Sequence, residues 1–297
     1  MWRWLMTSAE SSPQIRPSAD GRSGLPQGIG IGWRPEIAGV VADLPGLGFC
    51  EVIAESVPFY PIDRLRALGV PVIPHGIRLS LGGAEPVAHE RISLLADCAD
   101  LLGSPLVSEH IAFVRAGGIE AGHLLPIPRS REALDALTDN IRRTQDSLPV
   151  PLAVENIAAL FDWPDDEYTE GEFLTELIER TGVHLLLDVE NVYACALNRG
   201  TDPARDLARL PAERIAYCHV AGGRFIGGRY HDTHTDPVPT EVLEMVSQVA
   251  ETGAAQAFML ERDGNYPPAR ELLTELDAIA DAARMAKVTT GSRWWVA

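Results

Sequence analysis

Short, continuously apolar runs alternate along the chain with longer segments whose hydrophobic residues follow a helical period. Eight such runs occur, at residues 28–33, 49–56, 70–77, 106–113, 151–158, 184–191, 215–222 and 256–263. Continuous rather than alternating hydrophobicity, as in Leu185-Leu186-Leu187, is typical of strands covered on both faces of a parallel sheet. The eight runs are therefore predicted to be parallel strands.

The segments between these runs are predicted to be helices. Residues 85–102 and 131–148 carry an apolar stripe, and Ser130 is a candidate N-cap for the second segment. Residues 173–181 and 240–252 are each followed by a glycine, which commonly terminates a helix. Strand followed by helix, repeated eight times, favours a single (β/α)8 TIM barrel over an open doubly wound sheet.

The two ends of the chain lack this repeat. Residues 1–26 are rich in Ser, Pro, Arg and Gly without a hydrophobic period, so we expect a flexible N-terminal leader. The barrel is predicted to span residues 27–286, with a C-terminal tail over residues 287–297.

Composition narrows the classes of function. The chain has 42 acidic and 25 basic residues and a formal net charge of -17, which disfavours binding to nucleic acid or to anionic membranes. No apolar run approaches the roughly 18 residues of a membrane span. The four cysteines form no CxxC pair and are interpreted as reduced thiols. We therefore expect a cytoplasmic protein without a nucleic-acid or membrane partner.

The predicted strands begin apolar and most of them finish with ionisable side chains. In a (β/α)8 barrel the carboxyl ends of all strands surround one mouth, and carboxylates gathered there need compensating cations. Histidines beside carboxylates favour Fe, Mn, Zn or Co. Glu109 and His110 are neighbours on one strand, so only one can face the mouth, and we favour His110. The polar residues at or just after the strand ends are Glu55, His75, Glu109, His110, Glu155, Asn156, Asp188, Asn191, His219, Asp232, His234, Glu261 and Asp263.

Short motifs containing these residues occur in a characteristic order. They are Gly30-Ile31-Gly32-Trp33-Arg34-Pro35, Pro74-His75-Gly76-Ile77-Arg78-Leu79-Ser80-Leu81-Gly82, Ser108-Glu109-His110-Ile111-Ala112, Leu124-Leu125-Pro126-Ile127-Pro128, Glu155-Asn156, Leu186-Leu187-Asp188-Val189-Glu190-Asn191, His219-Val220-Ala221-Gly222, Asp232-Thr233-His234 and Leu260-Glu261-Arg262-Asp263. With this set, the chain from about residue 28 to about residue 276 resembles the multinuclear non-haem iron-dependent oxidative enzymes, which include the oxidase of methanobactin biosynthesis.

The resemblance implies a TIM barrel that binds two or three iron ions, in mixed Fe(II) and Fe(III) states, with O2 as co-substrate. Glu155 is the implied bridging carboxylate, and Asn156 or Asn191 would assist a third iron. Asn156 and Asp263 are candidate catalytic residues; Asp263 could be a general base, and a surface salt bridge is the alternative for it. The implied metal ligands are His75, His110, Glu155, Asp188, His219, Asp232, His234 and Glu261.

The resemblance further implies oxidative modification of a residue, expected to be cysteine, in a ribosomally synthesised precursor peptide of natural product biosynthesis. A small partner protein would present the leader of that peptide. Ser56, Glu190 and Arg262 depart from the family pattern, which usually has Asn, Asn and Trp there. Two alternatives remain: a divalent-metal sugar isomerase or phosphodiesterase of the xylose isomerase/endonuclease IV type, and a binding protein without catalytic activity. Residues 222–228 are expected to form a mobile loop near the mouth that contacts substrate, or a plain hinge.

Overall fold

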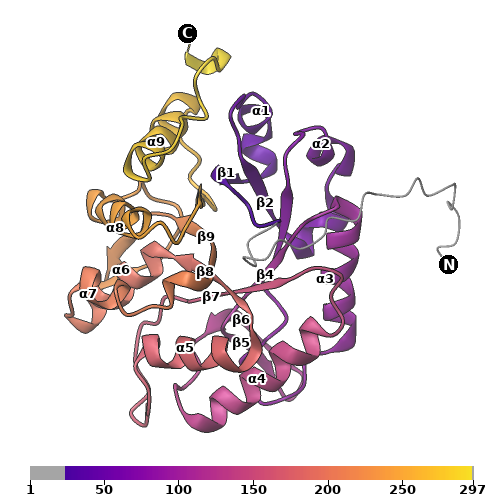
Figure 1. Ribbon diagram of the computed structural model, residues 1–297, viewed down its shortest axis with the longest axis vertical. Helices are drawn as coiled ribbons and strands as arrows, with labels where there is room; N and C mark the ends of the chain where they lie inside the picture. Colours follow the sequence, from indigo (N-terminus) through magenta and orange to yellow (C-terminus); the bar gives the residue numbers. More distant parts are fainter. Residues whose placement is uncertain (1–23, 296–297) are drawn as a thin grey trace, which may run out of the picture.

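The computed structural model describes residues 24–295 and contains a closed barrel of eight parallel strands (Figure 1). Around the barrel the strands follow the order β1 (Gly28–Gly32), β12 (Ala257–Leu260), β9 (Ile215–Val220), β8 (His184–Asp188), β7 (Leu152–Glu155), β4 (Val107–His110), β3 (Val72–Gly76) and β2 (Phe49–Ile53). The predicted (β/α)8 fold is confirmed. Six of the eight predicted strands extended two or three residues too far at their carboxyl ends, because the chain leaves the sheet soon after the polar residues at the mouth.

Helices form the outer ring around the strands (Figure 1). The α-helices are α1 (Ala38–Val41), α2 (Ile62–Arg66), α3 (His89–Leu102), α4 (Arg131–Gln145), α5 (Glu170–Thr181), α6 (Val189–Arg199), α7 (Pro203–Leu207), α8 (Thr240–Glu251) and α9 (Ala269–Ala282). Short 3-10 helices are η1 (Pro35–Ile37), η2 (Ala54–Phe59), η3 (Ala212–Arg214) and η4 (Arg293–Trp295). The Ser130 side chain accepts a hydrogen bond from the Ala133 amide at 3.2 Å, so the expected N-cap is present.

The barrel interior is filled in layers, because alternate residues of each strand point inward. One layer is apolar and closed, and it consists of Phe49, Ile73, Leu106, Ala153, Leu186, Tyr217 and Met259. Two residues further along the same strands the interior becomes polar, with Glu51, His75, Ser108, Glu155, Asp188, His219 and Glu261. The buried apolar layer thus lies directly beneath a polar layer that faces the mouth of the barrel.

Two β-hairpins extend from loops at the carboxyl end of the barrel. The first joins β5 (Phe113–Ala116) to β6 (Ile119–Leu125), and the second joins β10 (Arg224–Ile226) to β11 (Arg229–His231). The second hairpin contains most of the stretch that was expected to be a loop. Gly227 and Gly228 have φ of 60° and 82°, as the two central residues of a type I′ hairpin turn require.

The chain after α9 packs against the amino-terminal part of the barrel. Val288 and Thr289 are buried, and the Val288 carbonyl accepts a hydrogen bond from the Gly46 amide at 3.4 Å. The predicted leader lies almost wholly outside the described residues. Within residues 24–295, no helix is both long and apolar enough to span a membrane.

Candidate metal centre

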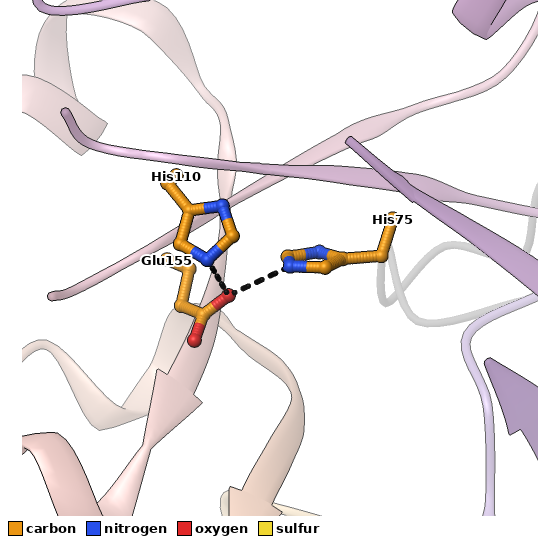
Figure 2. A group of neighbouring side chains, drawn as sticks. All are labelled: His75, His110 and Glu155. Carbon is orange, nitrogen blue, oxygen red and sulfur yellow. Dashed lines mark ion pairs between the residues drawn. The ribbon is translucent and has the colours of Figure 1, made fainter. Parts of the chain in front are cut away.

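Three side chains from adjacent strands meet inside the barrel mouth. His75 is the second-last residue of β3, His110 ends β4 and Glu155 ends β7. Figure 2 shows both imidazoles directed at the same carboxylate oxygen: Nε2 of His75 is 3.3 Å and Nε2 of His110 is 3.4 Å from Oε2 of Glu155. All three residues are buried, so this group of donors is shielded from bulk water.

A second group of donors shares Glu155 with the first. Nδ1 of His219 lies 3.4 Å from Oε1 of Glu155 and 2.7 Å from Oε2 of Glu261. Asp188 completes the group, with Oδ2 4.0 Å from the same nitrogen. The two oxygens of Glu155 therefore face two different sets of donors, which is the arrangement of a carboxylate that bridges two cations. We call the two groups together the inner cluster: His75, His110, Glu155, Asp188, His219 and Glu261.

A third group lies nearer the surface. Nε2 of His234 is 2.5 Å from Oδ1 of Asp232 and 3.5 Å from Oδ2 of Asp188. Glu190, in the first turn of α6, joins Asp188 and His234 within 4.8 Å. We call Asp188, Glu190, Asp232 and His234 the outer cluster. The expected ligands thus all lie together, and Glu190, treated on sequence only as a departure from the family pattern, lies among them.

Two strand-end carboxylates lie outside these clusters. Glu55 is in η2 and accepts a hydrogen bond from the Ile77 amide at 3.1 Å, and Glu109 accepts one from the Leu79 amide at 2.8 Å. The prediction that this strand ends at Glu55 is wrong, because β2 ends at Ile53 and Glu55 lies in the following 3-10 helix. The carboxylate that β2 places inside the barrel is Glu51, which sequence reasoning missed although it lies two residues after the inward-facing Phe49.

Asn156 and Asn191 brace the cluster through the backbone. The Asn156 side chain donates to the Asp188 carbonyl and accepts from the Asp188 amide, both at 3.0 Å. Asn191 donates to the Asn156 carbonyl at 3.0 Å, and its own amide donates to Oδ1 of Asp188 at 2.7 Å. Both polar atoms of the Asn156 side-chain amide therefore form hydrogen bonds with the backbone of Asp188, and these bonds fix the position of Asp188.

Asp263 lies at the edge of the cluster with its side chain 40% exposed. Its Oδ1 accepts hydrogen bonds from Nε and Nη2 of the buried Arg34 at 3.1 and 2.5 Å. Burial lowers the pKa of Arg34, but Asp263 and Glu261 outweigh it, so the net shift is upward and the guanidinium stays charged. Oδ2 of Asp263 lies 3.7 Å from Nδ1 of His234. Asp263 therefore forms a salt bridge, the alternative named for it, although with the buried Arg34, and its other oxygen is directed toward the outer cluster.

Arg262 points away from the site. Nη2 of this buried residue lies 2.5 Å from both carboxylate oxygens of Glu275 on α9. Successive residues of an extended segment face opposite sides, so with Glu261 directed inward Arg262 packs outward against the helix. The departure at Arg262 consequently does not alter the wall of the metal centre.

The electrostatics of the clusters favour bound positive charge, either protons or cations. Burial raises the pKa of Glu155 to about 7, and burial also raises the pKa of Asp188. Burial lowers the pKa of His219 and of His234, but surrounding carboxylates, Glu261 and Asp232 foremost, raise both well above the ordinary range. Without a metal, protons would have to balance this concentration of negative charge.

Buried polar atoms without a hydrogen-bond partner gather in the same place. Among the described residues they include Oε2 of Glu155, Oδ2 of Asp188, both carboxylate oxygens of Glu190, Nδ1 of His219, Oδ1 of Asp232 and Nε2 of His234. Buried polar atoms are normally paired, and each unpaired one costs about 1–3 kcal/mol. Imidazole and carboxylate donors directed at common points fit a cluster of transition-metal ions.

The clusters open into a cavity of about 250 Å³. His123 of β6 and His231 of β11 line it, so both hairpins contribute to its walls. The apolar part of its lining consists of Ile53, Ile77, Leu124, Ile157, Ala158 and Leu160. Pockets for drug-sized ligands are usually about 300–1,000 Å³, so this space suits one side chain better than a large molecule.

Residues 28–284 match the profile of a protein family described as RiPP precursor modification enzyme MbnB/TglH/ChrH. RiPPs are ribosomally synthesised, post-translationally modified peptides. A UPF0276 protein of Streptomyces avermitilis is 54% identical over 263 residues, which cover 85% of this chain and 54% of that protein. A UPF0276 protein of Caulobacter vibrioides is 36% identical over 84% of this chain and 92% of its own length. The chain thus spans about half of the Streptomyces relative and most of the Caulobacter one.

Solved structures with the same barrel are more distant in sequence. Endonuclease IV from Thermus thermophilus has a TM-score of 0.58 at 20% identity, covering 86% of this chain and 99% of that one. D-allulose 3-epimerase from a Methylomonas species has a TM-score of 0.57 at 12% identity, covering 90% and 96%. At such identities the likeness establishes the fold alone.

Proposed function

Since the chain belongs to the RiPP precursor modification enzyme family MbnB/TglH/ChrH, we propose that it oxidises a cysteine in a precursor peptide with a cluster of iron ions and O2. Family and fold indicate an enzyme. The observation that carries the proposal is Glu155, whose two oxygens face separate groups of histidine and carboxylate donors. Such a bridge suits two metal ions acting together.

We propose three positions that iron could occupy. The first would be held by His75, His110 and Glu155, the second by Glu155, Asp188, His219 and Glu261, and the third by Asp188, Glu190, Asp232 and His234. When bound, ferrous and ferric ions together would supply a site for O2 and a Lewis acid that binds a thiolate.

The protein's own groups orient the substrate and take up its proton. Asp263 is partly exposed at the cavity, and Arg34 fixes its orientation through two hydrogen bonds, so it is placed to accept the thiol proton as general base. Asn156 keeps Asp188 in position. The apolar wall of the cavity limits the access of water to the oxidised residue.

The peptide would enter between the two hairpins. Phe225 and Ile226 on β10 and Ile119 on β6 are large apolar side chains exposed by 65%, 51% and 75%. Exposed apolar groups on these hairpins, which also supply His123 and His231 to the cavity wall, suit contact with an extended peptide. We further propose, from the family resemblance, a small partner protein that holds the peptide's leader.

The competing function is isomerisation or epimerisation of a sugar, which the names of the structural neighbours raise. Two assays on the iron-loaded protein separate these functions. The first measures O2 consumption with a cysteine-containing precursor peptide, and the second measures conversion of aldoses without O2. We expect O2 uptake that depends on the peptide, and a decrease in the mass of the peptide that corresponds to the removal of hydrogen atoms. Sugar conversion without peptide-dependent O2 uptake would overturn the proposal. Glu179→Gln, a change on the exposed face of α5, is the control and should behave as the wild type.

A further inference from the structure

A continuous hydrogen-bonded chain lies beneath the inner cluster and joins two of its histidines. Nδ1 of His75 is 2.8 Å from Oγ of Ser108, which is 2.8 Å from the Tyr217 hydroxyl. That hydroxyl donates to Oε2 of Glu51 at 2.5 Å, and the same oxygen lies 2.9 Å from Nε2 of His219. The five residues come from β2, β3, β4 and β9 and are all at most 1% exposed.

We infer that Glu51, Ser108 and Tyr217 position His75 and His219 as metal ligands and couple the first and second metal positions. We call these three residues the Glu51 network. The inference rests on metal binding by the inner cluster, as in the proposed function. It concerns residues that touch no metal, so they are positioning rather than catalytic residues.

The direction of the hydrogen bonds follows from the chemistry of the groups. A carboxylate only accepts, so the chain ends at Glu51, to which both Tyr217 and His219 donate. The Tyr217 oxygen then accepts from the Ser108 hydroxyl, and Ser108 accepts from Nδ1–H of His75. In this direction each hydroxyl donates once and accepts once, as buried polar groups require.

This direction fixes which ring nitrogen of each histidine carries a proton. With metal bound, Nε2 of His75 and Nδ1 of His219 would be the nitrogens free to ligate, and they lie 3.3 Å from Glu155 and 2.7 Å from Glu261. Metal-ligating histidines generally donate their other N–H to such a partner, which sets the tautomer and strengthens the ligand.

His110 provides an internal comparison. Its Nδ1 lies 3.1 Å from the Gly76 carbonyl, so the backbone sets its tautomer without help from the Glu51 network. Changes in the network should therefore weaken ligation by His75 and His219 and leave His110 as it is. A single carboxylate, Glu51, serves both of the other histidines, and it links the two metal positions that share Glu155.

The test is anaerobic titration of the metal-free full chain with Co²⁺, followed by visible absorption, which reports ligand geometry as well as affinity. Ser108→Ala and Tyr217→Phe should lower the affinity for Co²⁺ at the position that contains His75 by roughly 10- to 100-fold. Glu51→Gln should weaken both positions by a similar factor and change both sets of absorption bands. Ser104→Ala is the matched control, because Ser104 is also buried beside β4 but donates to the Leu106 carbonyl outside the network.

Wild-type affinity and spectra in all three network variants would overturn the inference while leaving the proposed function intact. Failure of the wild type to bind Co²⁺ or iron would overturn both. Thermal melting of each metal-free variant separates loss of positioning from loss of folding. If Glu51→Gln does not fold, Ser108→Ala and Tyr217→Phe decide the question, since each removes only one hydroxyl.

Discussion

The inner and outer clusters share Asp188 but are built in different ways. The residues of the inner cluster lie at or next to the ends of barrel strands and are nearly all fully buried. In His110 and His219, the ring nitrogen that faces away from Glu155 forms a hydrogen bond with another part of the barrel. The outer ligands Asp232 and His234 come from the segment after β11, and Glu190 from the start of α6. His234 has a φ of 49°, a conformation that non-glycine residues rarely adopt.

This difference indicates a division of labour. Strand ends of a closed barrel fix the inner ligands relative to one another, which suits a permanent metal pair. The outer donors come from a loop and from the start of a helix, and Glu190, one of the three departures from the family pattern, lies among them. Exchanging an amide for a carboxylate there adds a negative charge to the third position.

The largest effect is expected at Glu155. Glu155→Gln keeps the size of the side chain but removes the bridging negative charge from both inner positions. We expect the bound iron to fall by about two ions per chain and peptide-dependent O2 uptake to fall by more than about 100-fold. Iron analysis and oxygen-electrode measurements on the same samples check this. Near-normal iron content would show that Glu155 does not bridge.

His234→Ala tests whether the clusters are separate. It removes the imidazole of the outer cluster while the inner strand-end ligands remain, so we expect one iron fewer per chain and O2 uptake lowered by roughly 10- to 100-fold. Mössbauer spectra should keep the signals of the inner pair. Loss of all the iron in this variant would mean that the two clusters assemble only as a unit.

Glu190→Gln is expected to weaken metal binding the least of the three variants, and its effect on stability should have opposite signs with and without metal. Burial and Asp232 raise the pKa of Glu190 to about 11 in the metal-free protein. A carboxyl whose folded-state pKa is raised stabilises the fold below the unfolded pKa of about 4.5, and this contribution is lost as pH rises toward the folded value.

Metal-free wild type should therefore lose unfolding free energy relative to Glu190→Gln between pH 6 and 9, by at most about 1.4 kcal/mol per pH unit. Urea unfolding at the two pH values measures this. With metal bound, the wild type should be the more stable of the two proteins, because Glu190 loses its proton and becomes a ligand. The variant should bind the third ion about tenfold more weakly. Parallel pH profiles for the two proteins would contradict a role for Glu190.

The fold could be read from the sequence because strands buried on both faces are continuously apolar, and eight of them with helices between admit few arrangements. The residues at the mouth could also be predicted from the sequence, because the last inward-facing side chain of a barrel strand lies at the mouth. Glu55 and Glu51 show the limit of that rule: the apolar run continues past the true end of β2, and only inward alternation from Phe49 identifies Glu51.

Other features depended on contacts that the sequence does not display. The hairpin β5–β6 was not predicted, since its exposed strand β6 lacks a buried face. Glu190 was overlooked as a donor because its place in the first turn of α6, against Asp232 and His234, arises from packing between distant segments. The outward turn of Arg262 toward Glu275 likewise depends on α9.

We propose that this barrel holds at least two iron ions, which Glu155 would bridge. Iron determination on wild-type protein purified without oxygen tests it most directly, with zinc and manganese measured in the same sample. We predict two or three iron ions per chain. A single zinc ion per chain, or no metal, would contradict the claim.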